Sequence, residues 1–90
     1  MRLEFDNAKR DITLAERGLD FARAAEVFEG IHLTAPDSRQ DYTEDRFITM
    51  GYLDERLVVL VWTPRDEVRR IISMRKANDR EKAFYDRYVD

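Results

Sequence analysis

The chain has 90 residues, of which 43% are hydrophobic and 39% are charged. This length supports one hydrophobic core, so we expect a single domain over residues 1–90. The longest apolar run spans six residues, far below the roughly 20 that cross a bilayer, which predicts a cytoplasmic protein without membrane contact. The chain has no cysteine and one histidine, which excludes disulfides, thiolate zinc sites, cysteine nucleophiles and His-rich metal sites.

The net charge of −3 is unevenly distributed. Residues 1–45 carry six basic and eleven acidic side chains, whereas residues 46–90 carry ten and eight. Residues 65–82 alone hold seven basic side chains against four acidic ones. A phosphate-bearing ligand at close range responds to such a local excess more than to the net charge, although charge-rich surfaces often produce one.

The first third of the chain predicts one strand and two helices. Residues 2–6 alternate polar and apolar side chains, which is typical of a strand. Asp6 is a favourable N-cap for a helix over residues 7–17, and Gly18 is a favourable stop. The inner face of this helix is expected to carry Ala8, Ile12 and Ala15. A second helix is expected from Asp20 to Gly30, with Phe21, Ala24, Ala25 and Phe28 on one face.

The rest of the chain predicts four strands and a final helix. Residues 31–34 read as a short extended segment and residues 35–43 as a loop. Residues 46–53 and 56–63 predict an antiparallel hairpin, whose second strand is apolar on both faces and therefore central. Pro64 is expected to end that strand, because proline cannot donate to a strand ladder. A further strand covers residues 68–76.

Asn78 and Glu81 form a capping-box pattern at the start of a last helix over residues 79–89. The predicted order is therefore β-α-α-β-β-β-β-α. This order indicates an α+β, two-layer domain with a mostly antiparallel sheet, two N-terminal helices and one C-terminal helix.

Strict alternation along residues 67–76 predicts two strand faces. The face expected to meet the helices holds Val68, Arg70, Ile72, Met74 and Lys76. The face expected to be open to a ligand holds Arg69, Ile71, Ser73 and Arg75, and Arg65 and Arg46 are placed to join it. Such arginines bind phosphates through guanidinium forks, but they also decorate solvated sheet edges, and spacing alone does not separate the two interpretations.

Other residues carry two interpretations as well. Tyr52, Trp62 and Tyr85 suit stacking on RNA bases, but the core is the more common place for them. Glu81 shares the apolar side of the last helix and sits beside basic residues, an arrangement that tunes proton-transfer groups and is also an ordinary capping box. His32 is isolated, and we interpret it as structural or exposed.

The sequence resembles the BrnT toxins of bacterial type II toxin–antitoxin systems, small RNA-cleaving proteins related in fold to the RelE toxins. The matching N-terminal positions are Leu3, Glu4, Phe5, Asp6, Ala8, Lys9, Gly18, Phe21, Ala24, Ala25, Val27 and Phe28. The matching C-terminal positions are Glu44 to Phe47, Val61 to Thr63, Arg65, Arg70 to Ser73, Arg75 to Ala77, Glu81 and Tyr85. The run from Ile71 to Ala77 followed by Glu81 is the most specific part.

The resemblance implies ribonuclease activity, and our leading hypothesis is a metal-independent endoribonuclease without a cofactor, in which the 2′-hydroxyl of RNA attacks the adjacent phosphate. The resemblance also implies a BrnA-like antitoxin partner with a ribbon-helix-helix region, a toxin–antitoxin hetero-oligomer, and contact with operator DNA only through the antitoxin. The catalytic candidates are Arg65, Arg75, Lys76 and Glu81. The RNA-binding candidates are Lys9, Arg46, Arg69 and Ser73.

The chain departs from the family pattern in its first predicted helix. Thr13, Glu16 and Arg17 stand where the family often has Asn, Lys and His. If the family's histidine transfers a proton, this protein must use another group or be a weak enzyme. Met74 replaces a usual alanine and is expected to add bulk only on the core face. These departures motivate an alternative, a catalytically weak module that binds an antitoxin and modulates operon repression. A structural domain with merely solvated charged edges is the third interpretation.

Overall fold

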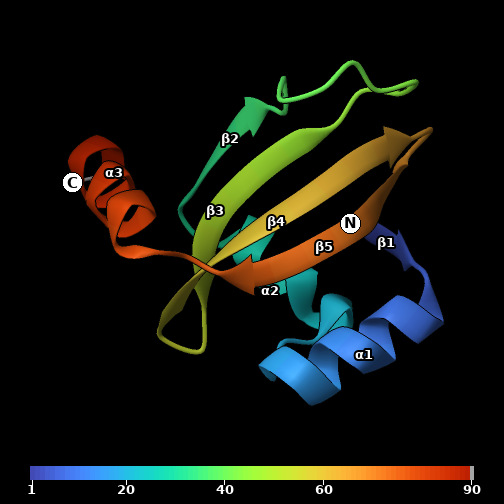
Figure 1. The fold of residues 1–90 in the computed structure, drawn as a ribbon, viewed down its shortest axis with the longest axis horizontal. Helices are drawn as coiled ribbons and strands as arrows, with labels where there is room; N and C mark the ends of the chain where they lie inside the picture. The colour runs from blue at the N-terminus through green and yellow to red at the C-terminus, as the bar shows by residue number, and fades with distance from the viewer. Residues whose placement is uncertain (90) are drawn as a thin grey trace.

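A five-stranded mixed sheet organises the computed structural model, which describes residues 1–89 (Figure 1). The elements in chain order are β1 (Arg2–Phe5), α1 (Asn7–Arg17), the 3-10 helix η1 (Phe21–Arg23), α2 (Ala24–Glu29), β2 (His32–Pro36), β3 (Phe47–Leu53), β4 (Arg56–Arg65), β5 (Val68–Lys76) and α3 (Asp79–Val89). The sheet order is β1-β5-β4-β3-β2, with β1 parallel to β5 and the other pairs antiparallel. No helix in residues 1–89 is long and apolar enough to cross a membrane.

The helices begin where capping side chains satisfy their first N–H groups. The Asp6 carboxylate accepts from the backbone N–H groups of Ala8 and Lys9, and α1 ends at Gly18, whose φ of 69° is left-handed. Asn78 and Glu81 exchange two hydrogen bonds of 2.8 and 2.9 Å at the start of α3. The predicted start of α1 and the predicted capping box of α3 are both confirmed.

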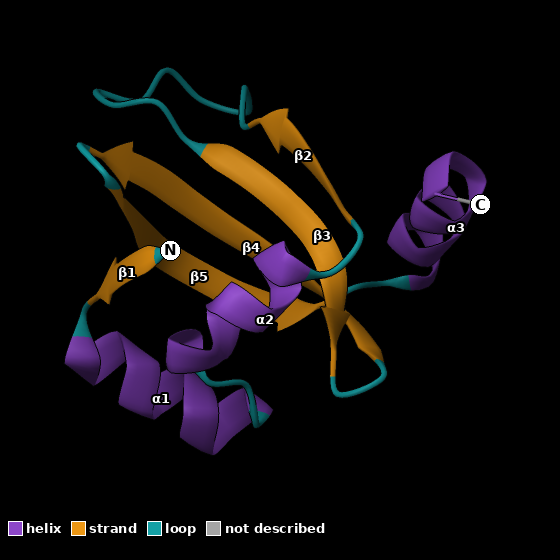
Figure 2. Ribbon diagram, turned by 180° about the vertical axis from the view of Figure 1, so that it is seen from behind, coloured by secondary structure: helices purple, strands orange, loops and turns teal. Residues whose placement is uncertain are grey.

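Helices pack against both faces of the sheet: α2 crosses in front of it in Figure 2, and α3 contacts the opposite face through Tyr85 and Val89. One core combines side chains of η1 and α2 with β4 and β5: Phe21, Ala24, Val27, Phe28, Val58, Leu60, Trp62, Ile71 and Met74. A second core combines Tyr85 and Val89 of α3 with Leu57 and Val59 of β4. Because successive strand residues point to opposite faces, α3 lies on the other side of the sheet from α1 and α2. The expected two-layer arrangement, with all helices on one face, is therefore wrong.

The strand β4 is central and buried on both faces, as its sequence predicts. It continues through Pro64, which pairs with Arg69, to Arg65. The expectation that Pro64 ends the strand is wrong because β3 pairs with β4 only as far as Trp62. The missing N–H of Pro64 therefore interrupts no hydrogen bond to β3.

A β-bulge changes the predicted faces of β5. Ser73 pairs with Val61 and Ile71 pairs with Trp62, so Ile72 is an extra residue without a partner on β4. The bulge ends strict alternation, and it places Ile71 and Met74 on the same core face.

As a result, the arginines of β5 are distributed between the two sheet faces differently from the prediction. Arg69 lies on the α2 face, 4.4 Å from the Phe28 ring centre and 4.9 Å from the Trp62 ring centre. Arg70, Ser73 and Arg75 share the opposite face, which is the α3 face. The predicted row of Arg69, Ile71, Ser73 and Arg75 is therefore wrong, because a bulge shifts the period of two by one residue.

The helix α1 packs through polar side chains. None of its residues is buried, Ile12 is 58% exposed, and Ala8 and Ala15 are exposed, so the predicted inner face is wrong. Arg10 instead forms two hydrogen bonds to Asp20, at 2.7 and 2.9 Å, and Arg17 donates to the Met74 carbonyl at 2.8 Å. The side chains of η1 and α2 already fill the core on this face, which leaves α1 at its rim.

Candidate functional site

The end of β5 and the start of α3 bring Arg75 and Glu81 into contact. We call the segment from Arg75 to Glu81 the corner. The guanidinium of Arg75 donates to both carboxylate oxygens of Glu81, from Nη1 to Oε1 at 2.8 Å and from Nη2 to Oε2 at 2.7 Å. The side chains are 44% and 23% exposed, so solvent and ligands reach the pair. A bidentate pair of this kind holds a carboxylate in one orientation.

The pairing changes the proton affinity of both groups. Hydrogen bonds from Arg75 lower the pKa of Glu81, burial opposes that shift, and the N–H of Asn78 adds to it. The pKa of Arg75 is raised, chiefly by its hydrogen bonds to Glu81. Glu81 is therefore a carboxylate at neutral pH and can accept a proton. Its Oε1 already accepts from both Arg75 and Asn78, which leaves Oε2 as the less occupied oxygen.

Lys76 and Ser73 flank Arg75 on different sides of the sheet. Ser73 pairs with Val61 and lies on the α3 face with Arg75, half-buried. Lys76 pairs with Val58, whose side chain belongs to the core under α2, so the Lys76 side chain leaves toward the α1 side. Lys76 is exposed and has no carboxylate within 4.0 Å in residues 1–89.

Arg65 lies far from the corner on the same sheet face. It pairs with Val68, seven residues before Arg75, which corresponds to roughly 20 Å along the strand. Its guanidinium makes long ion pairs, 3.8 Å to Glu4 and 3.5 Å to Glu44. One reacting phosphate therefore cannot contact both Arg65 and Arg75.

The remaining RNA-binding candidates are also apart from the corner. Lys9 is exposed on α1, and Arg69 is stacked on aromatic rings on the α2 face. Arg46 lies 4.2 Å from the Tyr42 ring centre, and its Nε is buried without a hydrogen-bond partner in the described residues. Of the eight candidates, the structure brings Arg75 and Glu81 into contact. Ser73 lies on the same sheet face as Arg75, Lys76 extends from the opposite face, and the other four lie elsewhere.

Two of the three aromatic candidates belong to the core. The Trp62 indole donates to Thr49 at 2.8 Å, and the buried Tyr85 donates its hydroxyl to the Ile31 carbonyl at 2.8 Å. Tyr52 is 47% exposed and packs edge-on against Tyr85. His32 is half-buried and bonds through Nδ1 to the Gly30 carbonyl, which fits a structural role.

An apolar groove of about 470 Å³ lies directly beside the corner. It is lined by Leu33, Thr34, Ala35, Ile48, Met50, Glu81 and Phe84. Phe84 is 50% exposed, and its ring centre lies 4.7 Å from that of Tyr88, which is 62% exposed. An accessible aromatic ring at the wall of an apolar groove can stack on a planar ligand group.

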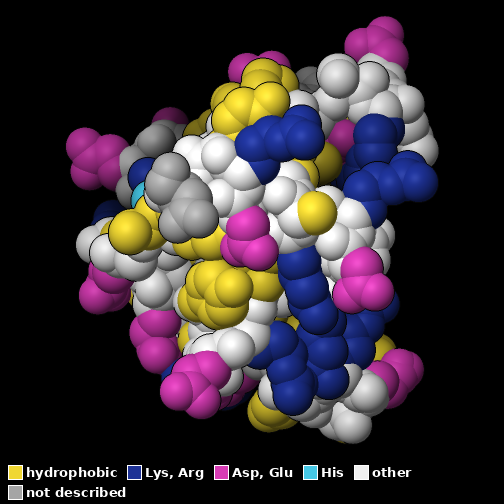
Figure 3. Space-filling model, turned by 90° about the vertical axis from the view of Figure 1, so that its left-hand side faces the viewer, with side chains coloured by type: hydrophobic (Ala, Val, Ile, Leu, Met, Phe, Trp, Pro, Cys, Tyr) yellow, Lys and Arg dark blue, Asp and Glu magenta, His cyan; other side chains and the backbone are white. Residues whose placement is uncertain are grey.

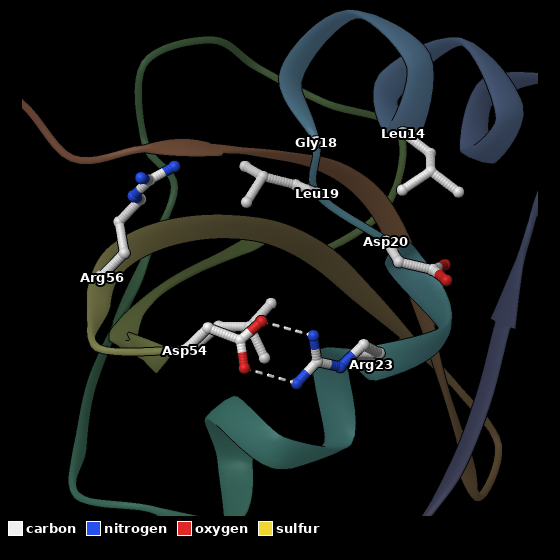
Figure 4. A pocket seen from close by; sticks show the side chains of 8 residues that line it. Leu14, Gly18, Leu19, Asp20, Arg23, Asp54 and Arg56 are labelled. Carbon is white, nitrogen blue, oxygen red and sulfur yellow. Dashed lines mark hydrogen bonds and ion pairs between the residues drawn. The ribbon is translucent and has the colours of Figure 1, made fainter.

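A second hollow, of about 370 Å³, lies between the end of α1 and the β3–β4 turn (Figure 4). Arg23 spans it with hydrogen bonds of 2.5 and 2.8 Å to Asp54, and Arg23 also binds Glu26. The charged groups that bridge this hollow are thus occupied by one another, and we assign it a structural role. Within residues 1–89, no three His, Cys, Asp or Glu side chains lie close enough together to hold a metal ion.

Two arginines near the corner have no counterpart among the candidates from sequence. Arg17 reaches the Met74 carbonyl from α1, 57 residues away in the chain. Arg39 lies close enough to Arg75 for its charge to oppose the rise in the pKa of Arg75. Arg39 itself binds the buried Asp37 through two hydrogen bonds, of 2.7 and 2.8 Å. Local sequence patterns contain no signal for either contact, because both depend on the packing of distant segments.

A comparison with protein-family models identifies the family of the chain. A family model described as "Ribonuclease toxin, BrnT, of type II toxin-antitoxin system" matches residues 5–81, which include the corner through Glu81. The chain belongs to the BrnT family. Membership of this family of ribonuclease toxins supports ribonuclease activity and implies an antitoxin partner. A search of the curated proteins found no match to the chain.

Proposed function

We propose that this BrnT-family protein is a metal-independent endoribonuclease that acts at the corner. The bidentate Arg75–Glu81 pair carries the proposal, because it places an ionised carboxylate and a guanidinium together on an accessible surface. In this chemistry the 2′-hydroxyl of RNA attacks the adjacent phosphate, which needs a base, a proton donor for the leaving oxygen and a cation for the developing charge.

The corner supplies these groups from its own side chains. Glu81 accepts the 2′-hydroxyl proton at Oε2, and Arg75 keeps the carboxylate ionised while its guanidinium faces the phosphate. Lys76 is the candidate that returns a proton to the leaving 5′ oxygen. Ser73 shares the α3 face with Arg75 and is a candidate contact to the RNA.

Arg65 has a different role in this proposal. Its distance from Arg75 along the strand assigns it to a phosphate several nucleotides away on the same sheet face. The apolar groove beside Glu81 takes the base next to the reacting phosphate, stacked on Phe84.

RNA cleavage by the purified protein in EDTA tests this function. We expect the wild-type protein to cleave, Arg75→Ala to reduce the rate about 100- to 1000-fold, and Glu81→Gln to reduce it about 100-fold or more. Arg87→Ala, an exposed arginine in the last turn of α3, is the matched control and keeps the wild-type rate. Cleavage that requires an added metal, or that survives both corner substitutions, contradicts the proposal.

The same family membership supports the partner side of the proposal. We assign the antitoxin to the ribbon-helix-helix class and place the pair in a cytoplasmic hetero-oligomer that reaches operator DNA through the antitoxin alone. The α+β sheet with one C-terminal helix supports the proposed kinship in fold with the RelE toxins.

A catalytically weak antitoxin-binding module is the second candidate. The apolar groove and the exposed rings of Phe84 and Tyr88 favour it, because such a surface also accepts an apolar protein segment. Expression in a bacterium without the antitoxin separates the two: a ribonuclease arrests growth, whereas a binding module leaves growth unchanged.

A further inference from the structure

The edge of β5 is open over the half of the strand that leads to the corner. β1 pairs with β5 only from Val68 to Ile71, so no strand in residues 1–89 covers the edge beyond Ile71. The N–H of Ala77 donates to the Leu57 carbonyl of β4, and polar groups alternate sides along a strand. The carbonyl groups of Met74 and Lys76 therefore point away from β4, toward the open edge.

Two guanidinium groups meet these two carbonyls. Arg17 donates to the Met74 carbonyl from α1 at 2.8 Å, and Arg75 donates to the Lys76 carbonyl at 3.3 Å. Carbonyl groups two residues apart on one strand edge are separated by roughly 7 Å. Arg17 and Arg75 are thus anchored beside each other, although one comes from α1 and the other faces α3.

Arg17 has unused binding capacity. A guanidinium carries five N–H donors, and Nη1 of Arg17 makes its single hydrogen bond within residues 1–89. Neither Arg17 nor Lys76 has a carboxylate within 4.0 Å among those residues, whereas six other arginines do: Arg10, Arg23, Arg39, Arg65, Arg70 and Arg75. Arg17 and Lys76 are both exposed. Basic side chains gather in the lower half of the side that carries α3 (Figure 3).

We infer that Arg17 and Lys76 form a phosphate-binding cradle on the open edge of β5, which holds the RNA backbone against the Arg75–Glu81 pair. The inference rests on the proposed function and names Arg17 as a substrate-binding residue. The cradle lies between the end of α1 and the start of α3, so the RNA crosses the strand edge there. Arg17 also satisfies an edge carbonyl, a structural role that the experiment must separate from phosphate binding.

A mixed-sequence oligonucleotide in which every 2′-hydroxyl is methylated is the probe, because it binds without being cleaved. Its affinity is measured between roughly 0.1 and 0.5 M salt for the wild-type protein, Arg17→Gln, Arg17→Lys and the control Arg87→Gln. Affinity falls as salt rises, so a plot of log affinity against log salt has a negative slope. For single strands, each lost phosphate contact makes this slope shallower by about 0.7. We expect Arg17→Gln to lose about that much, and Arg17→Lys and Arg87→Gln to keep the wild-type slope.

The same series can overturn the cradle in two ways. An unchanged slope for Arg17→Gln overturns the inference, as does a wild-type protein that does not bind the probe. Equal loss of thermal stability in Arg17→Gln and Arg17→Lys with an unchanged slope assigns Arg17 to the structural role alone.

Cleavage of unmodified RNA separates the two proposals. Normal wild-type cleavage with an unchanged Arg17→Gln slope overturns the cradle and leaves the proposed function standing. A reduced slope in a protein that does not cleave supports the cradle and removes the proposed function.

Discussion

Because both of its side chains are accessible to solvent, the Arg75–Glu81 pair adds little to the stability of the fold. Exposed ion pairs stabilise proteins by about 0 to 1 kcal/mol, because solvent screens the charges and ordering the side chains costs entropy. Both side chains are accessible, and the adjacent Tyr85 anchors α3 to the sheet independently. Variants of Arg75 and Glu81 should therefore fold, and a loss of cleavage in them reports on chemistry.

The pH dependence of cleavage provides a test of Glu81 as the base. Hydrogen bonds from Arg75 lower the pKa of Glu81 below the ordinary value of 4.5. Glu81 therefore stays ionised until the pH falls to this lowered pKa. A reaction that needs the carboxylate loses rate as the pH falls through the lowered pKa. We expect Arg75→Lys to raise this pKa, because it removes the bidentate hydrogen bonds, and to move the acidic limb to higher pH.

The measurement is kcat/KM against pH for the wild-type protein, Arg75→Lys and a control Arg87→Lys. The acidic limb of kcat/KM reports on the free enzyme, so it follows Glu81 before RNA binds. An acidic limb at the same pH in all three proteins would show that Glu81 is not the titrating base.

At the scale of elements, local patterns predicted the helices better than the strand faces. Capping signals lie within a few residues of each helix start, and the predicted helices over residues 7–17 and 79–89 are observed with those bounds. No local sequence signal identifies Ile72 as the extra residue of the bulge. Its position is defined by the pairing of β5 with β4, a contact between strands that periodicity within one strand does not contain.

The packing of α2 on β3 leaves no room for a side chain at Gly51. A Cβ at this position would lie 2.8 Å from Cγ1 of Val27 and 3.3 Å from Cβ of His32. Gly51→Ala is expected to destabilise the protein by about 1 to 3 kcal/mol, because α2 must move away from the sheet. Gly30→Ala is the matched control, since the nearest atom to its Cβ would lie at 3.8 Å.

Urea unfolding of both variants, followed by circular dichroism, measures the difference. Gly30→Ala should stay within about 1 kcal/mol of the wild-type protein. Equal stability of the two variants would mean that the contact between α2 and β3 gives way without penalty.

At the scale of the whole molecule, the net charge and the local charge have opposite signs. The net charge is −3, yet Arg17 and Lys76 lie exposed at the open edge of β5 without a carboxylate within 4.0 Å among residues 1–89. The molecule measures 32 × 30 × 24 Å. The Debye length is about 30 Å in 0.01 M salt and about 8 Å in 0.15 M salt, so RNA senses the whole molecule in the first case and only the nearest groups in the second.

This contrast predicts an unusual salt dependence of association. Raising the salt from roughly 0.01 to 0.1 M should increase the association rate of the methylated oligonucleotide, because it screens the net repulsion first. Further salt should reduce the rate as it screens the cradle. Stopped-flow fluorescence measures this rate, and a steady fall over the whole range would contradict the expectation.

The candidate site was predictable from sequence to the extent that its parts are neighbours in the chain. Arg75 and Glu81 are six residues apart, and a turn between a strand and a helix brings them together. Arg17 comes from the other end of the molecule, and its place beside Arg75 depends on how α1 docks against β5. The separation of Arg65 from Arg75, roughly 20 Å, likewise depends on the register of two strands.

The open edge of β5 also bears on self-association. An uncovered strand edge presents carbonyl and N–H groups that a strand of another molecule can bind, the first step of edge-to-edge aggregation. Here the guanidinium groups of Arg17 and Arg75 occupy two of those carbonyls and place positive charge along the edge. The two arginines that we assign to RNA therefore also oppose the pairing of this edge with a strand of another copy.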